Sequence, residues 1–441
     1  MTAMVISKLK QISTQLKSGA AKAKTALARR AEAQSQHIVA LDIGTEYVKA
    51  MVGKIGENGN ISIVGVGRQR QGLSDMHSGA ISDIAAVVAN CDQALTKAEA
   101  QAGASVRRAV IGIAGELVQG TTSTIRYKRP DSAKEITMEE MEYILSRVQK
   151  RAYERARQQV VWETGNKDVD VKLVNSAIVS IHIDAYKVSN PIGFQGKDVA
   201  IQIYTAFAPI VHIGALERTA TELDLELIAV AAEPFAVTRA VIGTDASSNL
   251  SAVTIDVGGG TTDIAVVNDG GVEGTKMFGI GGRAFTRTIA SELEADFEAA
   301  EAVKMKISSG DLEEEVKQKA YSAVKRTLGV WLNGVKLALG DFTKVDHLPN
   351  QILLCGGGAS LKPLIMALEG DSWFRELPFA RKPQVRLISP KEVVGVVDFG
   401  TEVLDHTYIT AMGLLRVGLD TLDSGQTDDT IRDKLNKLLR V

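Results

Sequence analysis

Cysteine and histidine are scarce in this chain of 441 residues, and long apolar runs are missing. Two cysteines, Cys91 and Cys355, and six histidines without a cluster exclude a disulfide framework and a zinc site. No apolar run approaches the roughly 18 residues of a membrane-spanning helix. No continuous apolar core precedes a small-residue cleavage site near the start, which argues against a signal peptide. These absences predict a protein of a reducing, cytoplasmic compartment.

Charge is spread unevenly along the chain. Seven basic residues against Glu32 give the first 36 residues a net charge of +6, whereas the whole chain carries −2. Such a basic head on an acidic body favours an anionic surface as partner and argues against nucleic acid. Val5, Leu9, Ile12 and Leu16 form a narrow helical stripe in it, which suits a membrane, a partner helix or a solvated extension.

Two distant copies of one glycine-and-aspartate signature are the most informative feature. They are residues 41–45, with Lys49 following, and residues 255–263. β-branched and other apolar residues lead into each aspartate and apolar residues resume after the turn, so we predict two β-hairpins of buried strands. One such turn is more often structural than functional. Two copies favour a nucleotide clamp.

The residue types suit phosphate chemistry. Glycine lets backbone N–H groups approach phosphate oxygens, and threonine hydroxyls add donors. Lys49 would supply a point charge to the β- and γ-phosphates. Asp42, Asp256 and Asp263 would be repelled by phosphate unless Mg²⁺ lay between them, held through its waters. The predicted nucleotide-binding residues of the two hairpins are Asp42, Gly44, Thr45, Glu46, Tyr47, Lys49, Gly258, Gly259, Gly260, Thr261 and Thr262.

A third glycine-rich element lies at residues 352–361. An apolar strand there enters a turn of three glycines, Gly356, Gly357 and Gly358, that opens a helix. The turn is either an ordinary strand-to-helix loop or a place where the backbone lies against a purine or ribose.

Two phosphate hairpins and a glycine-rich adenosine loop in this order resemble the superfamily of actin, the heat-shock chaperone ATPases and hexokinase. Residues 190–196, 233–236, 300–304 and 411–415 further resemble the bacterial cell-division family FtsA, over about residues 37–418. The resemblance implies an α/β, actin-like (ribonuclease-H-like) two-domain ATPase fold with an inserted α+β subdomain. It also implies ATP and Mg²⁺ as ligands.

The resemblance assigns further site residues. Glu233 would orient the water that attacks the γ-phosphate if hydrolysis occurs, and Asp256 is the second predicted catalytic residue. Glu233 could equally be a helix-start acid before a proline. Whether ATP is hydrolysed or only bound stays open.

Four more residues are assigned to the nucleotide by the resemblance. Glu301 and Lys304 would contact the ribose or base, and Gly281 and Gly282 would approach the nucleotide by their backbone. The alternative for Glu301 and Lys304 is a solvated i,i+3 salt bridge.

At 441 residues the chain exceeds one core, so several parts are expected. We predict a basic N-terminal extension (1–36), the core of domain 1 (37–78 and 199–230, with 405–418), an inserted α+β subdomain (79–198), the core of domain 2 (231–275 and 348–404), a small, shortened helical subdomain (276–347), a flexible acidic linker (419–430) and an amphipathic helix (431–441).

The C-terminal segment predicts a membrane anchor. Ile431, Leu435, Leu438 and Leu439 share one helical face, with basic residues on the other, and FtsA resembles this ending. The alternative is a helix folded onto the core. Each aliphatic side chain contributes about 1.5–3 kcal/mol when fully buried, so after ordering costs the anchor would be weak. A polymer would add many such anchors together.

The predicted function is that of an actin-like ATP-binding protein that polymerises on the inner face of the cytoplasmic membrane at the division septum. By the resemblance its partners are the C-terminal tail of FtsZ, other division proteins at the inserted subdomain, further copies of itself, and anionic lipids through residues 431–441. One departure concerns FtsZ: after Lys304 the family has a longer subdomain, whereas here residues 308–310 lead into one helical stretch to about Leu339. The FtsZ surface is therefore expected to be reduced or remodelled.

Two other functions agree with parts of the sequence. A PilM-like cytoplasmic platform of a type IV pilus has the same fold but binds the short tail of a membrane partner, and the reduced late subdomain leaves room for it. A sugar or metabolite kinase is less supported, because no catalytic acid pairs with a polar sugar pocket.

Overall fold

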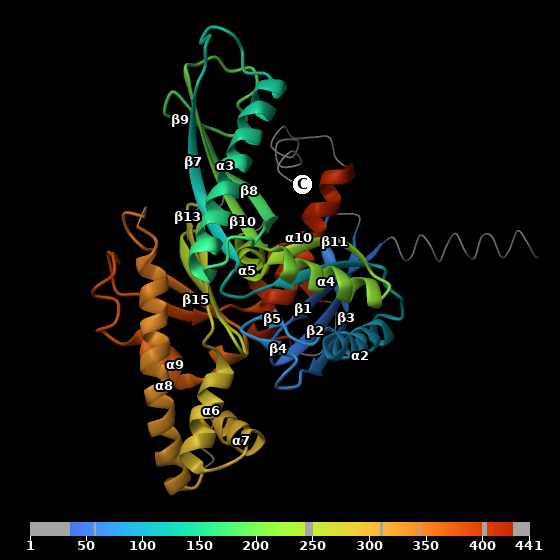
Figure 1. Cartoon of the computed structure of the whole chain (residues 1–441), viewed down its shortest axis with the longest axis vertical. Helices are drawn as coiled ribbons and strands as arrows, with labels where there is room; N and C mark the ends of the chain where they lie inside the picture. Colours follow the sequence, from blue (N-terminus) through green and yellow to red (C-terminus); the bar gives the residue numbers. More distant parts are fainter. Residues whose placement is uncertain are drawn as a thin grey trace, which may run out of the picture.

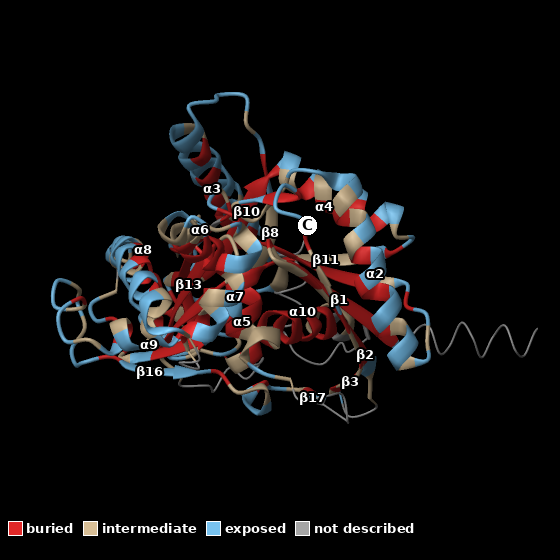
Figure 2. Ribbon diagram, turned by 90° about the horizontal axis from the view of Figure 1, so that it is seen from below, coloured by how far each residue is buried: buried red, intermediate tan, exposed pale blue. Residues whose placement is uncertain are grey.

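The computed structural model describes residues 36–56, 59–242, 250–308, 312–343, 345–398 and 404–426. These residues form two large β-sheets with helices packed around them (Figure 1) and a small sheet of two strands, β4 (Met76–His77) and β5 (Ala80–Ile81). The buried residues concentrate in the sheets and on the helix faces turned toward them (Figure 2).

The first sheet has six strands in the order β11-β6-β1-β2-β3-β17. Its strands are β1 (His37–Ile43), β2 (Tyr47–Ile55), β3 (Ile61–Arg70), β6 (Arg108–Ile113), β11 (Glu226–Ala232) and β17 (Val396–Asp398). Helix α2 (Ile84–Ala102) packs against β2 and β3, and α10 (Ile409–Gln426) packs against β1 and β6. Every residue of β1 is buried, which explains its nearly continuous apolar sequence.

The second sheet has nine strands in the order β16-β15-β12-β13-β14-β7-β10-β8-β9. Its strands are β7 (Gln119–Lys128), β8 (Val171–Ile183), β9 (Tyr186–Val188), β10 (Asp198–Pro209), β12 (Ala252–Val257), β13 (Thr262–Asn268), β14 (Gly271–Phe278), β15 (Gln351–Cys355) and β16 (Gln384–Leu387). The strands β7 to β10 form, with α3 (Met138–Thr164), a module that projects at one end of the molecule (Figure 1).

The remaining helices gather mostly around the second sheet. They are α4 (Ile210–Glu222), α5 (Glu233–Ile242), α6 (Gly282–Leu293), α7 (Phe297–Ile307), α8 (Glu314–Gly340) and α9 (Lys362–Glu369). Trp331 of α8 is fully buried, and its indole N–H donates to Thr262 Oγ1 at 2.9 Å. The long α8 is thereby fixed to the sheet, and it ends close to the predicted end at about Leu339.

The predicted boundaries of the inserted subdomain are wrong at both ends. Within the predicted range 79–198, β6 pairs in parallel with β1 and α2 packs on β2 and β3, so both belong to the first sheet. Conversely β10, assigned to the core of domain 1, pairs along its length with β7 and β8 of the module. Strand β17, assigned to domain 2, pairs with β3. Strand pairing depends on contacts between residues that are distant in the chain, so local sequence patterns do not predict which sheet a strand joins.

A narrow seam joins the module to the rest of the second sheet. β7 pairs with β14 through Thr121 opposite Gly274 and Gly120 opposite Thr275. The same strand pairs with β10 over ten residues, from Gln119 to Lys128. The module is thus internally well joined and more loosely attached to its neighbour.

The predicted linker beginning at residue 419 is also wrong. Helix α10 continues to Gln426, and Leu419 is fully buried. Asp420 accepts from Arg239 at 2.6 Å and from Arg416 at 2.9 Å, so its charge is paired rather than solvated. The acidic composition that suggested a linker therefore belongs in part to a packed helix.

Residues 1–35 and the predicted helix 431–441 lie outside the described residues. Within the described ranges no helix has the length and hydropathy needed to cross a membrane.

Candidate functional site

The two glycine-and-aspartate signatures form the predicted hairpins. β1 pairs antiparallel with β2, and β12 pairs antiparallel with β13. Each turn is closed in the same way, by Gly44 N–H donating to Tyr47 O at 3.1 Å and by Gly258 N–H donating to Thr261 O at 2.9 Å. The register sets Asp42 opposite Lys49 in the first hairpin and Asp256 opposite Asp263 in the second. Residues directly opposite share one face of a sheet, so both pairs are neighbours.

The turns of the two hairpins meet in space. A Cβ added at Gly260 would lie 2.6 Å from Thr45 Oγ1, and one added at Gly259 would lie 2.8 Å from Glu46 Cβ. Side chains on these glycines would push the turns apart. The sequence placed the two signatures more than two hundred residues apart, and the fold brings them into contact.

A buried cluster of acids lies below the turns. Asp42, Glu233, Asp256 and Asp263 are all buried, and Lys49 is the cation among them, with its Nζ 2.9 Å from Asp42 Oδ2. The charges of Asp42, Asp256 and Asp263 all act on Glu233, the first residue of α5. Four carboxyl groups around one ammonium group form a site that is short of positive charge.

Burial and mutual repulsion shift the protonation of these groups. Burial raises the pKa of Glu233, and the charge of Asp42 raises it further. Burial likewise raises the pKa of Asp256 and, with the charge of Asp256 beside it, the pKa of Asp263. Burial lowers the pKa of Lys49, but the charge and hydrogen bond of Asp42 and the charge of Asp256 together outweigh burial, so the pKa of Lys49 is raised. The cluster therefore favours protons or a bound cation.

The residues fit a cation that is held indirectly. Asp263 Oδ1 is buried and has no hydrogen-bond partner in the described part of the chain, while Oδ2 accepts from Thr261 Oγ1 at 3.1 Å. Among the described residues, no group of three or more Asp, Glu, His or Cys is arranged to coordinate a metal directly. An ion bound through water, as expected for Mg²⁺, is compatible with both observations.

Neutralising Asp263 should stabilise the free protein at alkaline pH. A carboxyl group whose pKa is raised by folding costs no stability below its unfolded pKa of about 4 and the full amount above its folded pKa. Asp263→Asn should thus raise the free energy of unfolding by about 1 kcal/mol or more at pH 8 and by little at pH 4.5. Urea titrations at both pH values measure this, with Asp269→Asn at an exposed turn as the matched control. Equal effects at both pH values would contradict the burial argument.

The third glycine element packs against the second hairpin. β15 pairs in parallel with β12, which sets Cys355 opposite Asp256. Gly356 has a φ of +83°, and a Cβ there would lie 2.0 Å from Asp256 Oδ1. Around Gly357, by contrast, a Cβ would meet nothing within 4 Å. Close packing against Asp256 therefore explains why residue 356 is glycine. Gly357 instead faces open space beside the turn.

The residues assigned to the ribose side lie on α6 and α7. Gly282 N–H donates to Gly258 O at 2.9 Å, which joins the start of α6 to the second turn. Lys304 forms the i,i+3 salt bridge with Glu301 at 2.8 Å and also donates to Thr286 Oγ1 at 2.9 Å. The salt bridge of the alternative interpretation is thus present, and a contact with nucleotide stays a prediction.

Sequence reasoning missed several residues of the site. Thr410, in the first turn of α10, donates its hydroxyl hydrogen to Asp256 Oδ2. The Tyr408 ring centre lies 6.0 Å from Lys49 Nζ. Glu46 accepts from Arg70 at 2.8 Å and from Arg283 at 2.7 Å, and its predicted contact with the nucleotide stays a prediction. No motif marked the threonine, the tyrosine or the two arginines, because their roles depend on elements that meet only in the fold.

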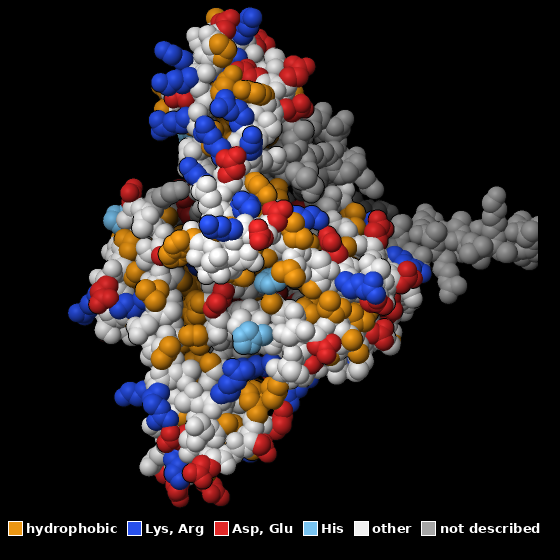
Figure 3. Space-filling view, viewed as in Figure 1, with side chains coloured by type: hydrophobic (Ala, Val, Ile, Leu, Met, Phe, Trp, Pro, Cys, Tyr) orange, Lys and Arg blue, Asp and Glu red, His pale blue; other side chains and the backbone are white. Residues whose placement is uncertain are grey.

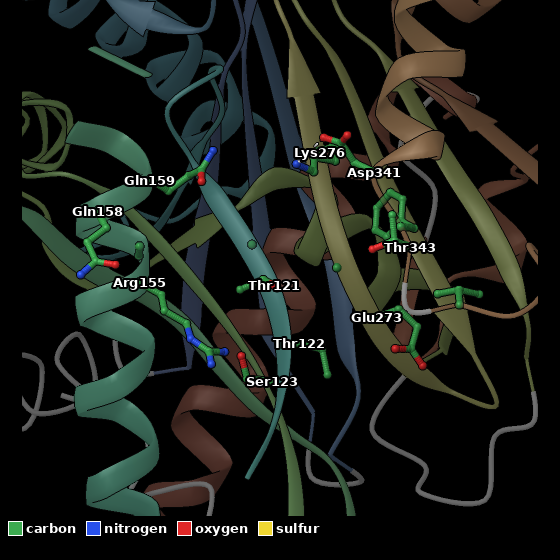
Figure 4. A pocket seen from close by; sticks show the side chains of 15 residues that line it. Thr121, Thr122, Ser123, Arg155, Gln158, Gln159, Glu273, Lys276, Asp341 and Thr343 are labelled. Atoms are coloured by element: carbon green, nitrogen blue, oxygen red, sulfur yellow. Dashed lines mark ion pairs between the residues drawn. The ribbon is translucent and has the colours of Figure 1, made fainter. Parts of the chain in front are cut away.

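A separate cavity of about 520 Å³ lies over the seam between β7 and β14 (Figure 4). Arg155, Gln158 and Gln159 of α3 line one side, and the ion pair of Lys276 with Asp341, 2.8 Å apart, lines the other. None of the clustered acids lines it. This cavity is therefore distinct from the site between the hairpins.

The fold and the paired hairpins define an actin-like α/β protein. Among solved structures, a complex of the type IV pilus proteins PilM and PilN matches with a TM-score of 0.61 at 17% identity, covering 87% of this chain and 98% of that one. At this identity the likeness supports the fold only. The predicted actin-like fold class is confirmed.

The sequence comparisons are more specific. The sequence model of the family "Cell division protein FtsA" matches residues 253–413. FtsA of Neisseria meningitidis serogroup B is 26% identical over 87% of this chain and 90% of its own length, and FtsA of Bacillus subtilis is 25% identical over 86% and 82%. The chain is therefore similar to the cell-division protein FtsA over most of its length, and the resemblance seen in the sequence is confirmed.

Proposed function

We propose that this chain is an actin-like cell-division protein that binds ATP with Mg²⁺ between its two hairpin turns and assembles on the inner face of the cytoplasmic membrane. The observation that supports it most is the meeting of the two turns over four buried acids and one lysine. Backbone N–H groups of the turns would bind the phosphates, and Lys49 would add a charge. The relatives' name supports the setting in cell division.

Asp42, Asp256 and Asp263 would hold the Mg²⁺ through its waters, as the unpartnered Asp263 Oδ1 suggests. Bound Mg²⁺ would neutralise part of the charge of the phosphates. Glu233 would orient the attacking water if ATP is hydrolysed, and burial, which raises its pKa, makes its carboxylate a stronger proton acceptor than a solvated one. Glu301 and Lys304 would contact the ribose or base, and Gly281, Gly282 and Gly357 would face it by their backbone.

Self-assembly would join copies head to tail. The exposed face of α3 carries Arg147, Lys150 and Arg151, and the start of α8 carries Glu314 and Glu315, which also pair with Lys317 and Lys319. Basic side chains gather over the projecting module and acidic ones at the opposite end of the molecule (Figure 3). Opposite charges at the two ends would steer successive copies together. The module would also receive other division proteins, and the α6 to α8 region would bind the C-terminal tail of FtsZ through a surface built on α8.

Sedimentation with anionic vesicles tests the membrane proposal. The matched variant ends at Gln426, because a cut after Gly418 would remove the buried Leu419 and the paired Asp420. With Mg²⁺ and ATP, the full chain should pellet with vesicles at least about tenfold more than the shortened chain, since assembly adds weak anchors together. Without ATP the difference should shrink.

Two results would contradict this proposal. Pelleting that is equal for both chains would remove residues 427–441 from membrane binding. Vesicle-independent binding to the short cytoplasmic tail of a membrane partner, with no response to an FtsZ tail peptide, would favour the PilM-like platform instead.

A further inference from the structure

Four charged side chains connect the two halves of the candidate site. Glu46 follows β1 and Arg70 ends β3, both in the first sheet, whereas Arg283 lies in the first turn of α6 and Glu298 in the first turn of α7. They form one chain of ion pairs: Arg283 to Glu46 at 2.7 Å, Glu46 to Arg70 at 2.8 Å, and Arg70 to Glu298 at 2.5 Å. We call this set the clasp.

Arg283 is the buried end of the clasp. Its side chain is 4% exposed, and besides Glu46 it donates to Leu73 O and Gly72 O, both at 3.3 Å. Its backbone N–H donates to Gly259 O in the second turn at 2.8 Å. Arg283 is therefore attached by its backbone to one hairpin and by its side chain to the loop beside the other.

Arg70 and Glu298 form the outer end. Glu298 is 65% exposed and Arg70 is 35% exposed, so this pair is screened by solvent and salt. Burial protects the inner pair, Arg283 with Glu46, from solvent and salt. Removing Arg283 would leave the charge of Glu46 partly buried and without this partner, which is energetically costly. The clasp thus has a strong inner part and a weaker outer part.

The clasp also explains Glu46 beside a proposed phosphate site. A free carboxylate at the tip of the first turn would repel phosphate. Here both of its oxygens accept from arginines, which neutralise it and aim it at the opposite domain.

We propose that the clasp latches the two domains together and gates the exchange of nucleotide at the site between the hairpins. Separating the turns would break the three contacts of Arg283 with the first domain at once. Nucleotide enters and leaves only when these contacts open, so the clasp sets the rate of exchange. This proposal rests on the proposed ATP site for its exchange step, whereas the latch itself requires no ligand.

Two measurements on the full chain test the clasp. The first is the release rate of a fluorescent ATP analogue, chased with unlabelled ATP and Mg²⁺ in a stopped-flow instrument. Arg283→Gln should speed release about 10-fold to 100-fold, the loss expected for charged hydrogen bonds. Arg287→Gln is the matched control, since Arg287 is exposed one turn further along α6. Arg70→Gln should speed release less than Arg283→Gln does. Raised salt should change the release rate least in Arg70→Gln, because this variant lacks the exposed pair with Glu298 that salt screens.

The second measurement needs no nucleotide. Spin labels at Asp92→Cys in α2 and Ser291→Cys in α6, both exposed, report the distance between the domains by pulsed electron resonance. The nucleotide-free parent should give one narrow distribution, and adding Arg283→Gln should broaden it and lengthen its mean. An unchanged distribution overturns the clasp whatever the protein binds. Failure of the parent to bind the analogue overturns the ATP proposal instead, while the label distances still test the latch.

Discussion

Lys49→Met is expected to reduce the affinity for Mg²⁺ and ATP by about 10-fold to 100-fold. Lys49 is the cation in contact with the buried acids, and its Nζ lies 2.9 Å from Asp42 Oδ2. Its removal would leave the four carboxyl groups facing the phosphates without that charge. Charge-assisted hydrogen bonds contribute about 1.5–3 kcal/mol, and a tenfold change in affinity corresponds to about 1.4 kcal/mol. Isothermal titration calorimetry measures the effect.

Lys54→Met is the matched control for this experiment. Lys54 lies on the same strand, β2, but its side chain is exposed. It should bind nucleotide as the parent does. If Lys49→Met also binds normally while remaining folded, then Lys49 serves only as the structural partner of Asp42, and the phosphate role assigned to it is wrong.

Gly356→Ala is expected to lower the free energy of unfolding by about 3 kcal/mol or more. Gly356 has a left-handed φ of +83°, and a Cβ there would lie 2.0 Å from Asp256 Oδ1 and 2.6 Å from Val257 O. Backbone strain and a clash with a buried strand both add to the cost. Denaturation in urea, followed by circular dichroism, measures it.

The neighbouring glycine supplies the control and a test of the ligand. At Gly357 a Cβ meets nothing within 4 Å, so Gly357→Ala should change stability by less than about 0.5 kcal/mol. Gly357→Val should fold equally well but weaken ATP binding, because its side chain would fill the space proposed for the adenosine. Unchanged ATP affinity in Gly357→Val would remove this turn from the nucleotide site.

Local signals predicted the parts of the molecule that are built locally. The hairpins at Asp42 and Asp256 follow from apolar strands around glycine turns, and α8 follows from an uninterrupted helical pattern ending near Leu339. The boundaries of the module failed for a different reason. The sequences of β6 and β10 both have the apolar pattern of a buried strand. Only the strands they pair with, β1 for β6 and β7 for β10, show that β6 belongs to the first sheet and β10 to the second.

The wrong prediction of a linker from residue 419 also arose because a contact with a distant part of the chain was not visible in the sequence. The acidic residues after Gly418 suggested a solvated linker, yet Asp420 is paired with Arg239 and Arg416. Arg239 lies 181 residues earlier in the chain, on α5. The Asp420 side chain is only 12% exposed, and a charge so far removed from water is costly without a partner. Local composition does not show that partner, because it lies in a distant part of the chain.

By itself, the sequence determined the chemistry available to each hairpin. The turn length fixes the register, and the register sets Asp42 opposite Lys49 and Asp256 opposite Asp263. Only the tertiary structure decided that the two turns meet, that Thr410 reaches Asp256, and that Glu46 pairs with two arginines. The reason is physical: hairpin geometry depends on neighbouring residues, whereas the pairing of buried charges depends on which distant elements pack against one another.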